Sequence, residues 1–275
     1  MHTASVGFHC PDCVSPSSLL VSNRLRRRPT GQVFGDGGLA VHSSQSFITR
    51  ILIAFNFGAF LMTLITGGSL ASGGGDLTID YGLVGYGRVR NGLLIDHVGV
   101  AENEWWRIVT SAFLHGGIIH LAFNMFLLWV LGSMLEKVHG SSRYLSIFFG
   151  SLATGSLGVM LLDPLALTIG ASGAVFGLMG STVTFQIRRG VNPWSSGIGS
   201  LLALNLVFTF IRPNISIGGH IGGLIGGLIL GWMYDEIDLR RLPRFIGALI
   251  SWVYVTVCVV VTIWAAGRWW DPVLG

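Results

Sequence analysis

Long apolar segments alternate with short polar segments over most of the chain. Windows of about 20 mainly apolar residues, the length that a bilayer core requires, lie near 48–67, 117–135, 144–162, 170–187, 198–211, 217–234 and 246–266. The fifth window is short, and polar side chains interrupt the second. The pattern predicts seven transmembrane helices.

The amino-acid composition also indicates a membrane protein. Charged residues make up 11% of the 275 residues and hydrophobic residues 51%, whereas a soluble domain has about 25% charged residues. We therefore expect an all-α integral membrane protein. We divide it into a flexible cytoplasmic tail over 1–46, a six-helix core over 47–236, and a cytoplasmic linker with an extra C-terminal helix over 237–275.

The tail is rich in Ser, Gly and Arg and has no long apolar run or cleavable signal peptide. It holds one CxxC, Cys10 to Cys13. One CxxC supplies half of the four ligands of a structural zinc site, and His2 and His9 could supply others. We interpret the two cysteines as reduced cytosolic thiols and expect no metal site.

Basic residues predict the orientation in the membrane. With a cytoplasmic N-terminus, twelve of the 17 Lys and Arg residues lie inside and five outside, so the positive-inside rule favours N-in and C-out. Basic loops that face anionic lipid also explain the net charge of +4, without nucleic-acid binding. The inside set is Arg24, Arg26, Arg27, Arg28, Arg50, Lys137, Arg143, Arg188, Arg189, Arg240, Arg241 and Arg244, and the outside set is Arg88, Arg90, Arg107, Arg212 and Arg268.

Polar side chains inside three of the predicted spans need a partner or a task, because they are costly in hydrocarbon. The second span carries His120 and Asn124, which are four residues apart and so share a helix face. The fourth span begins with Ser172 and the sixth with His220. These three spans run in the same direction, so the four side chains converge on one layer near the outer surface.

This layer has the residue types of nucleophilic catalysis. A serine hydroxyl becomes a good nucleophile when a histidine takes its proton, which assigns Ser172 as nucleophile and His220 as base. Asn124, His120 and the Ser172 backbone N–H could donate to the oxyanion. No carboxylate lies at that depth in these spans, so we expect a Ser-His dyad. Taken alone, Ser172 could instead bond to a carbonyl one turn back, and His220 could relay protons or pack.

Glycines surround these residues. Gly173 and Gly177 in the fourth span, and Gly223 and Gly227 in the sixth, are small-xxx-small pairs that let membrane helices approach closely. Close packing would bring Ser172 within reach of His220.

Several of these motifs together resemble those of the rhomboid family of intramembrane serine proteases. Gly170-Ala171-Ser172-Gly173 resembles the family's GxSG, His220 with Gly223 and Gly227 its HxxGxxxG, and His115, His120 and Asn124 its second-helix pattern. Glu104-Trp105-Trp106-Arg107 resembles its Trp-Arg loop motif; Glu104 could pair with Arg107 or cap a short helix. The resemblance covers about residues 48–235 and implies a rhomboid-like six-helix bundle, here with one extra C-terminal helix.

The chain departs from the family at two positions. Phe176 stands where a tyrosine often stacks on the histidine, so it keeps the ring and loses the hydroxyl, and Gly219 replaces an alanine. Carried over residue by residue, the resemblance implies Ser172 as nucleophile, His220 as base, and His120 and Asn124 as oxyanion donors. Gly170, Gly173, Phe176, Glu104, Arg107, Gly223 and Gly227 would support the site.

The resemblance implies an intramembrane serine endopeptidase of a bacterial cell membrane. It would cleave transmembrane segments of other membrane proteins near the outer face, with the lipid bilayer as its surroundings and no cofactor. Two alternatives remain open: a catalytically inactive relative that binds client helices, and a small-molecule transporter. Transporters commonly have internal repeats and midplane sites, and neither is evident here.

Overall fold

The computed structural model describes residues 2–3, 8–9, 46–91, 94–213 and 215–268. The chain divides into two compact units, residues 1–41 and 42–275. In the first unit, the described residues form strands β1 (His2–Thr3) and β2 (Phe8–His9), which pair antiparallel. Cys10 and Cys13, and most of the predicted tail, lie outside the described residues.

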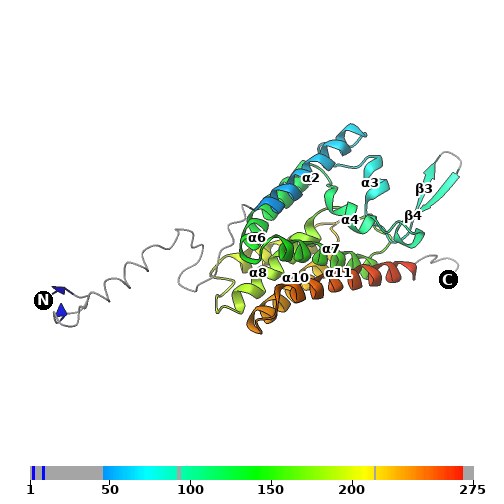
Figure 1. The fold of residues 1–275 in the computed structure, drawn as a ribbon. Coiled ribbons are helices and arrows are strands. Elements are labelled where there is room, and N and C mark those ends of the chain that lie inside the picture. The colour runs from blue at the N-terminus through cyan, green and yellow to red at the C-terminus, as the bar shows by residue number, and fades with distance from the viewer. Residues whose placement is uncertain (1, 4–7, 10–45, 92–93, 214, 269–275) are drawn as a thin grey trace. The chain divides into compact units, whose positions relative to one another are not determined.

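The second unit is helical (Figure 1). Its long helices coincide with the seven predicted spans and are, in chain order, α2 (Phe47–Ile65), α5 (Ile118–Leu127) with η4 (Leu128–Gly132) and α6 (Ser133–His139), α7 (Ser141–Leu162), α8 (Ser172–Ile187), α9 (Ile198–Ile211), α10 (Ile217–Leu239) and α11 (Arg244–Gly267). The one-turn π-helix η4 lets α5 and α6 form one span, Ile118–His139.

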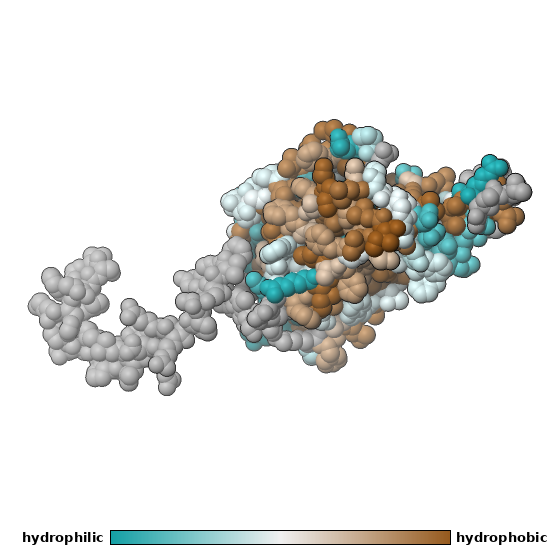
Figure 2. Space-filling view, turned by 90° about the horizontal axis from the view of Figure 1, so that it is seen from above, coloured by the Kyte–Doolittle hydropathy of each residue, from teal (hydrophilic) through white to brown (hydrophobic). Residues whose placement is uncertain are grey.

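Five of these helical segments are long and apolar enough to cross a membrane. The other two, α8 with 16 residues and α9 with 14, are shorter. Hydrophobic side chains cover a broad part of the face seen in Figure 2, and exposed side chains on α2, α9 and α11 are mostly apolar. The chain is therefore a multi-pass integral membrane protein, as the hydrophobic pattern predicts.

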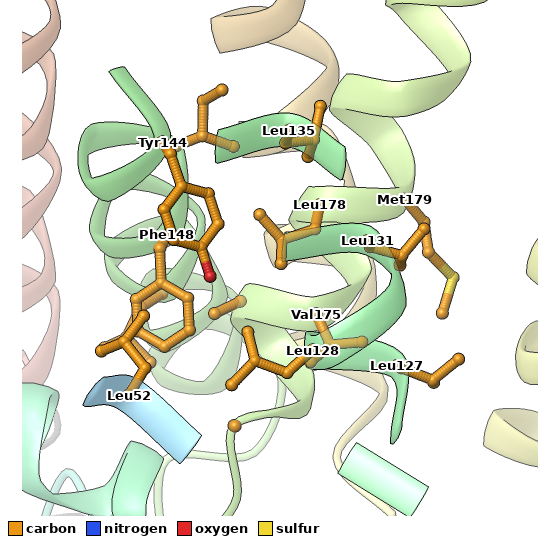
Figure 3. Packing of buried hydrophobic residues seen from close by; sticks show 14 of the residues in the cluster. Leu52, Leu127, Leu128, Leu131, Leu135, Tyr144, Phe148, Val175, Leu178 and Met179 are labelled. Carbon is orange, nitrogen blue, oxygen red and sulfur yellow. The ribbon is translucent and has the colours of Figure 1, made fainter. Parts of the chain in front are cut away.

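The core lies between α2, α5 to α6, α7 and α8. Figure 3 shows its leucines, with Tyr144 and Phe148 of α7, packed between these helices. α8 is almost enclosed, because α7 and α10 flank it and twelve of its 16 residues are buried. A short helix can remain at the centre of the bundle, since protein rather than lipid surrounds most of its surface.

Glu136 of α6 is a fully buried acid whose role the sequence does not reveal. Its carboxylate accepts hydrogen bonds from the Ile48 and Thr49 backbone N–H groups at 3.0 and 2.9 Å, and from the Thr49 and Ser141 hydroxyls at 2.8 and 2.9 Å. The first N–H groups of a helix have no acceptor within that helix. Glu136 thus satisfies the start of α2 from another part of the chain.

The segment between α2 and α5 holds α3 (Asp76–Tyr81), the strands β3 (Gly87–Asn91) and β4 (Leu94–Val98), η2 (Val100–Glu102), α4 (Arg107–Thr110) and η3 (Ser111–Phe113). β3 and β4 form an antiparallel hairpin that projects from the helices in Figure 1. We call residues 66–117 the first loop segment.

The extra C-terminal helix, α11, packs along α7 and contacts η2. Its last turns join a second apolar cluster through Ala265 and Ala266, together with Val100 and Ile108 of the first loop segment and Met160 of α7. The Thr262 hydroxyl also lies 3.3 Å from the Ala153 carbonyl of α7. α11 therefore packs against α7 and the first loop segment, and it makes few contacts with α10.

Candidate active site

Ser172 is the first residue of α8 and follows a sharp change of chain direction. Gly170 has φ 122°, a conformation that L side chains rarely adopt, and its N–H donates to the Ser111 carbonyl at 2.9 Å. The first N–H in α8 with an acceptor in the same helix is that of Val175, bonded to Ala171. The N–H of Ser172 thus stays available at the positive end of the helix.

His220 lies in the first turn of α10, which Ser216 caps by accepting a hydrogen bond from the Gly219 N–H at 3.0 Å. The His220 Nε2 atom lies 2.8 Å from the Ser172 Oγ atom, although the two residues are 48 positions apart. Both residues are intermediate in burial, so neither is fully enclosed by the protein. The structure brings together the two residues predicted as nucleophile and base.

Glycines bring α8 and α10 into this contact. A Cβ atom at Gly223 would overlap the Gly173 carbonyl oxygen, and one at Gly227 would overlap the Gly177 carbonyl oxygen. Backbone therefore lies directly on backbone along the two helices. Both small-xxx-small pairs that the sequence analysis singled out lie in this contact.

Two further side chains hold the His220 ring. Phe176, one turn after Ser172, stacks on it with ring centroids 4.2 Å apart and an angle of 20° between planes. Thr209 of α9 approaches the other ring nitrogen, with its Oγ1 atom 2.7 Å from Nδ1. The sequence analysis predicted the stacking of Phe176 and missed Thr209.

His120 faces the same site from α5. Its Nδ1 atom accepts a hydrogen bond from the Gly116 N–H at 3.1 Å, so in the neutral ring the proton is on Nε2. A Cβ built at Gly170 would lie 2.9 Å from this Nε2 atom and 3.7 Å from Ser172 Oγ. The Nε2–H group is thus a donor beside the serine.

Asn124 and His115, the other two polar residues of the second-helix pattern, contact His120. The Asn124 side-chain amide donates to the carbonyl of His120 at 3.0 Å, one turn back in the same helix. His115 is fully buried before α5 and contacts the His120 ring edge to face, with centroids 5.0 Å apart. His115 therefore packs against the candidate oxyanion donor, and neither of its ring nitrogens has a hydrogen-bond partner among the described residues.

Glu104 and Arg107 organise the first loop segment. The Arg107 Nε atom donates to Glu104 at 2.7 Å, and its NH1 group donates to the carbonyls of Ile79 and Gly82 at 2.7 and 2.8 Å. The next residue, Leu83, exchanges two backbone hydrogen bonds with Thr168, at 2.9 and 2.7 Å. Arg107 thereby orders the backbone next to Leu83, which pairs with Thr168 four residues before Ser172.

The fold and the site define a class of protein: a helical membrane protein with a hydrogen-bonded serine and histidine at the ends of two tightly packed helices. The model of the Rhomboid domain family matches residues 102–237. "Putative rhomboid protease YdcA" of Bacillus subtilis is 36% identical over 149 residues, which cover 53% of this chain and 75% of that relative. The chain belongs to the rhomboid family.

Other relatives share parts of their length with this chain. "Rhomboid protease GluP" of Bacillus subtilis is 34% identical over 207 residues, 74% of this chain. "Rhomboid-like protease 3" of Toxoplasma gondii is 31% identical over 152 residues, 53% of this chain and 57% of that relative. The chain spans only 36% of the length of GluP.

Proposed function

We propose that this protein is an intramembrane serine endopeptidase with a Ser172–His220 dyad, which cleaves transmembrane segments of other membrane proteins near the outer face of the bilayer. The distance of 2.8 Å between Ser172 Oγ and His220 Nε2 carries the proposal. The names of the relatives, rhomboid proteases, support the same reaction type.

The reaction follows from the geometry. His220 Nε2 takes the hydroxyl proton while Ser172 Oγ bonds to the substrate carbonyl carbon, which places a negative charge on the carbonyl oxygen. The proposal assigns the His120 Nε2–H and the Ser172 backbone N–H as donors to that oxygen. His220 then gives its proton to the leaving amine as the peptide bond breaks. A water, deprotonated by the same ring, then bonds to the acyl carbon, and the bond to Ser172 Oγ breaks as His220 returns the proton to that oxygen.

The orientation of the protein is part of this proposal. Arg188 and Arg189 lie at the end of α8 opposite Ser172, where they pair with Asp235 and Glu236 of α10. A basic end in the cytoplasm places Ser172 near the outer face. A topology reporter fused after Gly275 should be found on the external side of the membrane. A reporter found in the cytoplasm would contradict the placement of Ser172 near the outer face.

A serine-directed phosphonate tests the proposed chemistry directly. We expect it to label Ser172 in the purified protein, with the labelled peptide identified by mass spectrometry, and labelling to disappear in His220→Ala. Ser181 is an internal control, because it lies in the same helix, is fully buried and has no hydrogen-bond partner for its hydroxyl. A folded protein labelled at no serine, or at a serine other than Ser172, would exclude the dyad and favour a client-binding role.

The two candidate oxyanion donors should differ in effect. Losing one such donor costs about 100- to 1,000-fold in turnover. We expect a loss of this size in His120→Ala and a smaller loss in Asn124→Ala, because the Asn124 amide already donates to its own helix. Cleavage of a single-span model substrate gives kcat for each variant.

Asn56→Ala is the matched control for this comparison. Asn56 is also buried, and its amide donates to the carbonyl four residues back in α2, at 2.7 Å. It should retain the kcat of the wild type. A larger loss in Asn124→Ala than in His120→Ala would contradict the assignment of His120 as the principal side-chain donor.

A further inference from the structure

Thr209 contacts the candidate base at the nitrogen that does not face the serine. Its Oγ1 atom lies 2.7 Å from His220 Nδ1, and its side chain is 2% exposed. Among the described residues, this is the one hydrogen bond between α9 and the two helices that carry the dyad, α8 and α10. The dyad therefore has a polar neighbour from a third helix.

The hydrogen atoms can be assigned by counting donors and acceptors. A threonine hydroxyl has one proton, and the Thr209 hydroxyl donates it to the Asn205 carbonyl at 2.8 Å. With that proton directed at the Asn205 carbonyl, the hydroxyl can only accept from His220, and the proton between the two side chains is then that of His220 Nδ1. The neutral ring then has no proton on Nε2, which is the form that can take the proton of Ser172.

A purely structural role explains part of this arrangement. Threonines in membrane helices commonly donate to the carbonyl four residues back, which satisfies the hydroxyl. Thr182 of α8 does this with Leu178 at 2.8 Å, and its hydroxyl has no second hydrogen-bond partner among the described residues. Thr209 makes the same bond and in addition approaches His220, and helix-internal bonding does not account for that second contact.

We propose that Thr209 is a positioning residue for the base. It accepts a hydrogen bond from the Nδ1–H of His220 and so holds the ring in the tautomer that can deprotonate Ser172, while Phe176 fixes the ring plane. The inference rests on the proposed function. It adds a third member to the dyad, one without charge, where serine hydrolases with a triad have a carboxylate that orients the ring.

Thr209→Val tests this proposal, since valine keeps the shape of the side chain and removes the hydroxyl. We expect kcat to fall about 10- to 100-fold, a part of the whole contribution of a general base, with KM within about twofold of the wild type. Thr209→Ser restores the hydroxyl and should recover most of kcat. Thr182→Val, an equally buried change on α8, should leave kcat unchanged.

A second readout does not depend on activity. In protein labelled with ¹⁵N-histidine, the His220 signals, assigned by their loss in His220→Ala, should show a proton on Nδ1 in the wild type and in Thr209→Ser. In Thr209→Val the ring should shift toward the Nε2–H form. Wild-type protein without proteolytic activity would refute the proposed function, and the nitrogen signals would still decide the role of Thr209. Unchanged signals in a folded Thr209→Val protein would overturn the inference.

Discussion

Replacing Ser172 by alanine should abolish cleavage of a model substrate, with a loss of at least about 10⁴-fold in kcat, since no other nucleophile remains for the covalent step. The change should leave the fold intact. Among the described residues, the Ser172 hydroxyl has one hydrogen-bond partner, His220, and the smaller alanine fits the space. Cleavage assays and thermal unfolding of the same preparations measure both effects.

Ser181→Ala is the matched control, because it removes a buried hydroxyl from the same helix two turns further on, where none of the described side chains bonds to it. It should cleave at the wild-type rate. A Ser172→Ala protein that remains folded and active would remove the basis of the proposed mechanism and leave binding of client helices as the better reading.

Replacing Gly227 by alanine should produce the second large effect, although alanine is intrinsically the better helix former by about 1 kcal/mol. The added methyl group would overlap the Gly177 carbonyl oxygen, so α8 and α10 must separate. Overpacking of this kind typically costs about 1–3 kcal/mol. Even a small shift between the two helices stretches the contact of Ser172 with His220, and a misplacement of about 1 Å can cost 100-fold in rate.

The control for this prediction is Gly58→Ala in α2. A Cβ at Gly58 would meet nothing within 4 Å, so the change tests helix propensity alone. We expect Gly58→Ala to leave thermal stability unchanged or to raise it, and Gly227→Ala to lower thermal stability and to slow cleavage. Equal behaviour of the two variants would show that the close approach of α8 and α10 does not limit stability or activity.

The sequence predicts most of the helices and the pairing of Ser172 with His220, and the physical reasons can be named. A bilayer requires long apolar helices, so hydrophobicity alone locates them. Ser172 and His220 are conspicuous because polar groups are costly in such helices. Both signals are local and can be read from one segment at a time.

Contacts between distant segments were not predictable in this way. Thr209 resembles any back-bonding threonine, and only the packing of α9 beside His220 reveals its second contact. Glu136 was similarly inconspicuous, because its partners at the start of α2 lie 87 and 88 positions away. The hairpin of β3 and β4 had a readable signal, an Asn-Gly pair at positions 91 and 92 between runs of strand-forming residues, which favours a tight turn.

The short length of α9 has a consequence for how the surrounding lipid acts on this protein. Fourteen helical residues span about 21 Å, whereas the hydrocarbon core is about 30 Å thick. Only four residues of α9 are buried, and one of them is Thr209. Hydrophobic mismatch therefore acts on the helix that we propose to orient the base, by tilting it or thinning the bilayer around it. If turnover of the proposed protease scales with the fraction of molecules in which α9 contacts His220, membrane thickness becomes a kinetic variable, and lipid changes the rate without touching a catalytic atom.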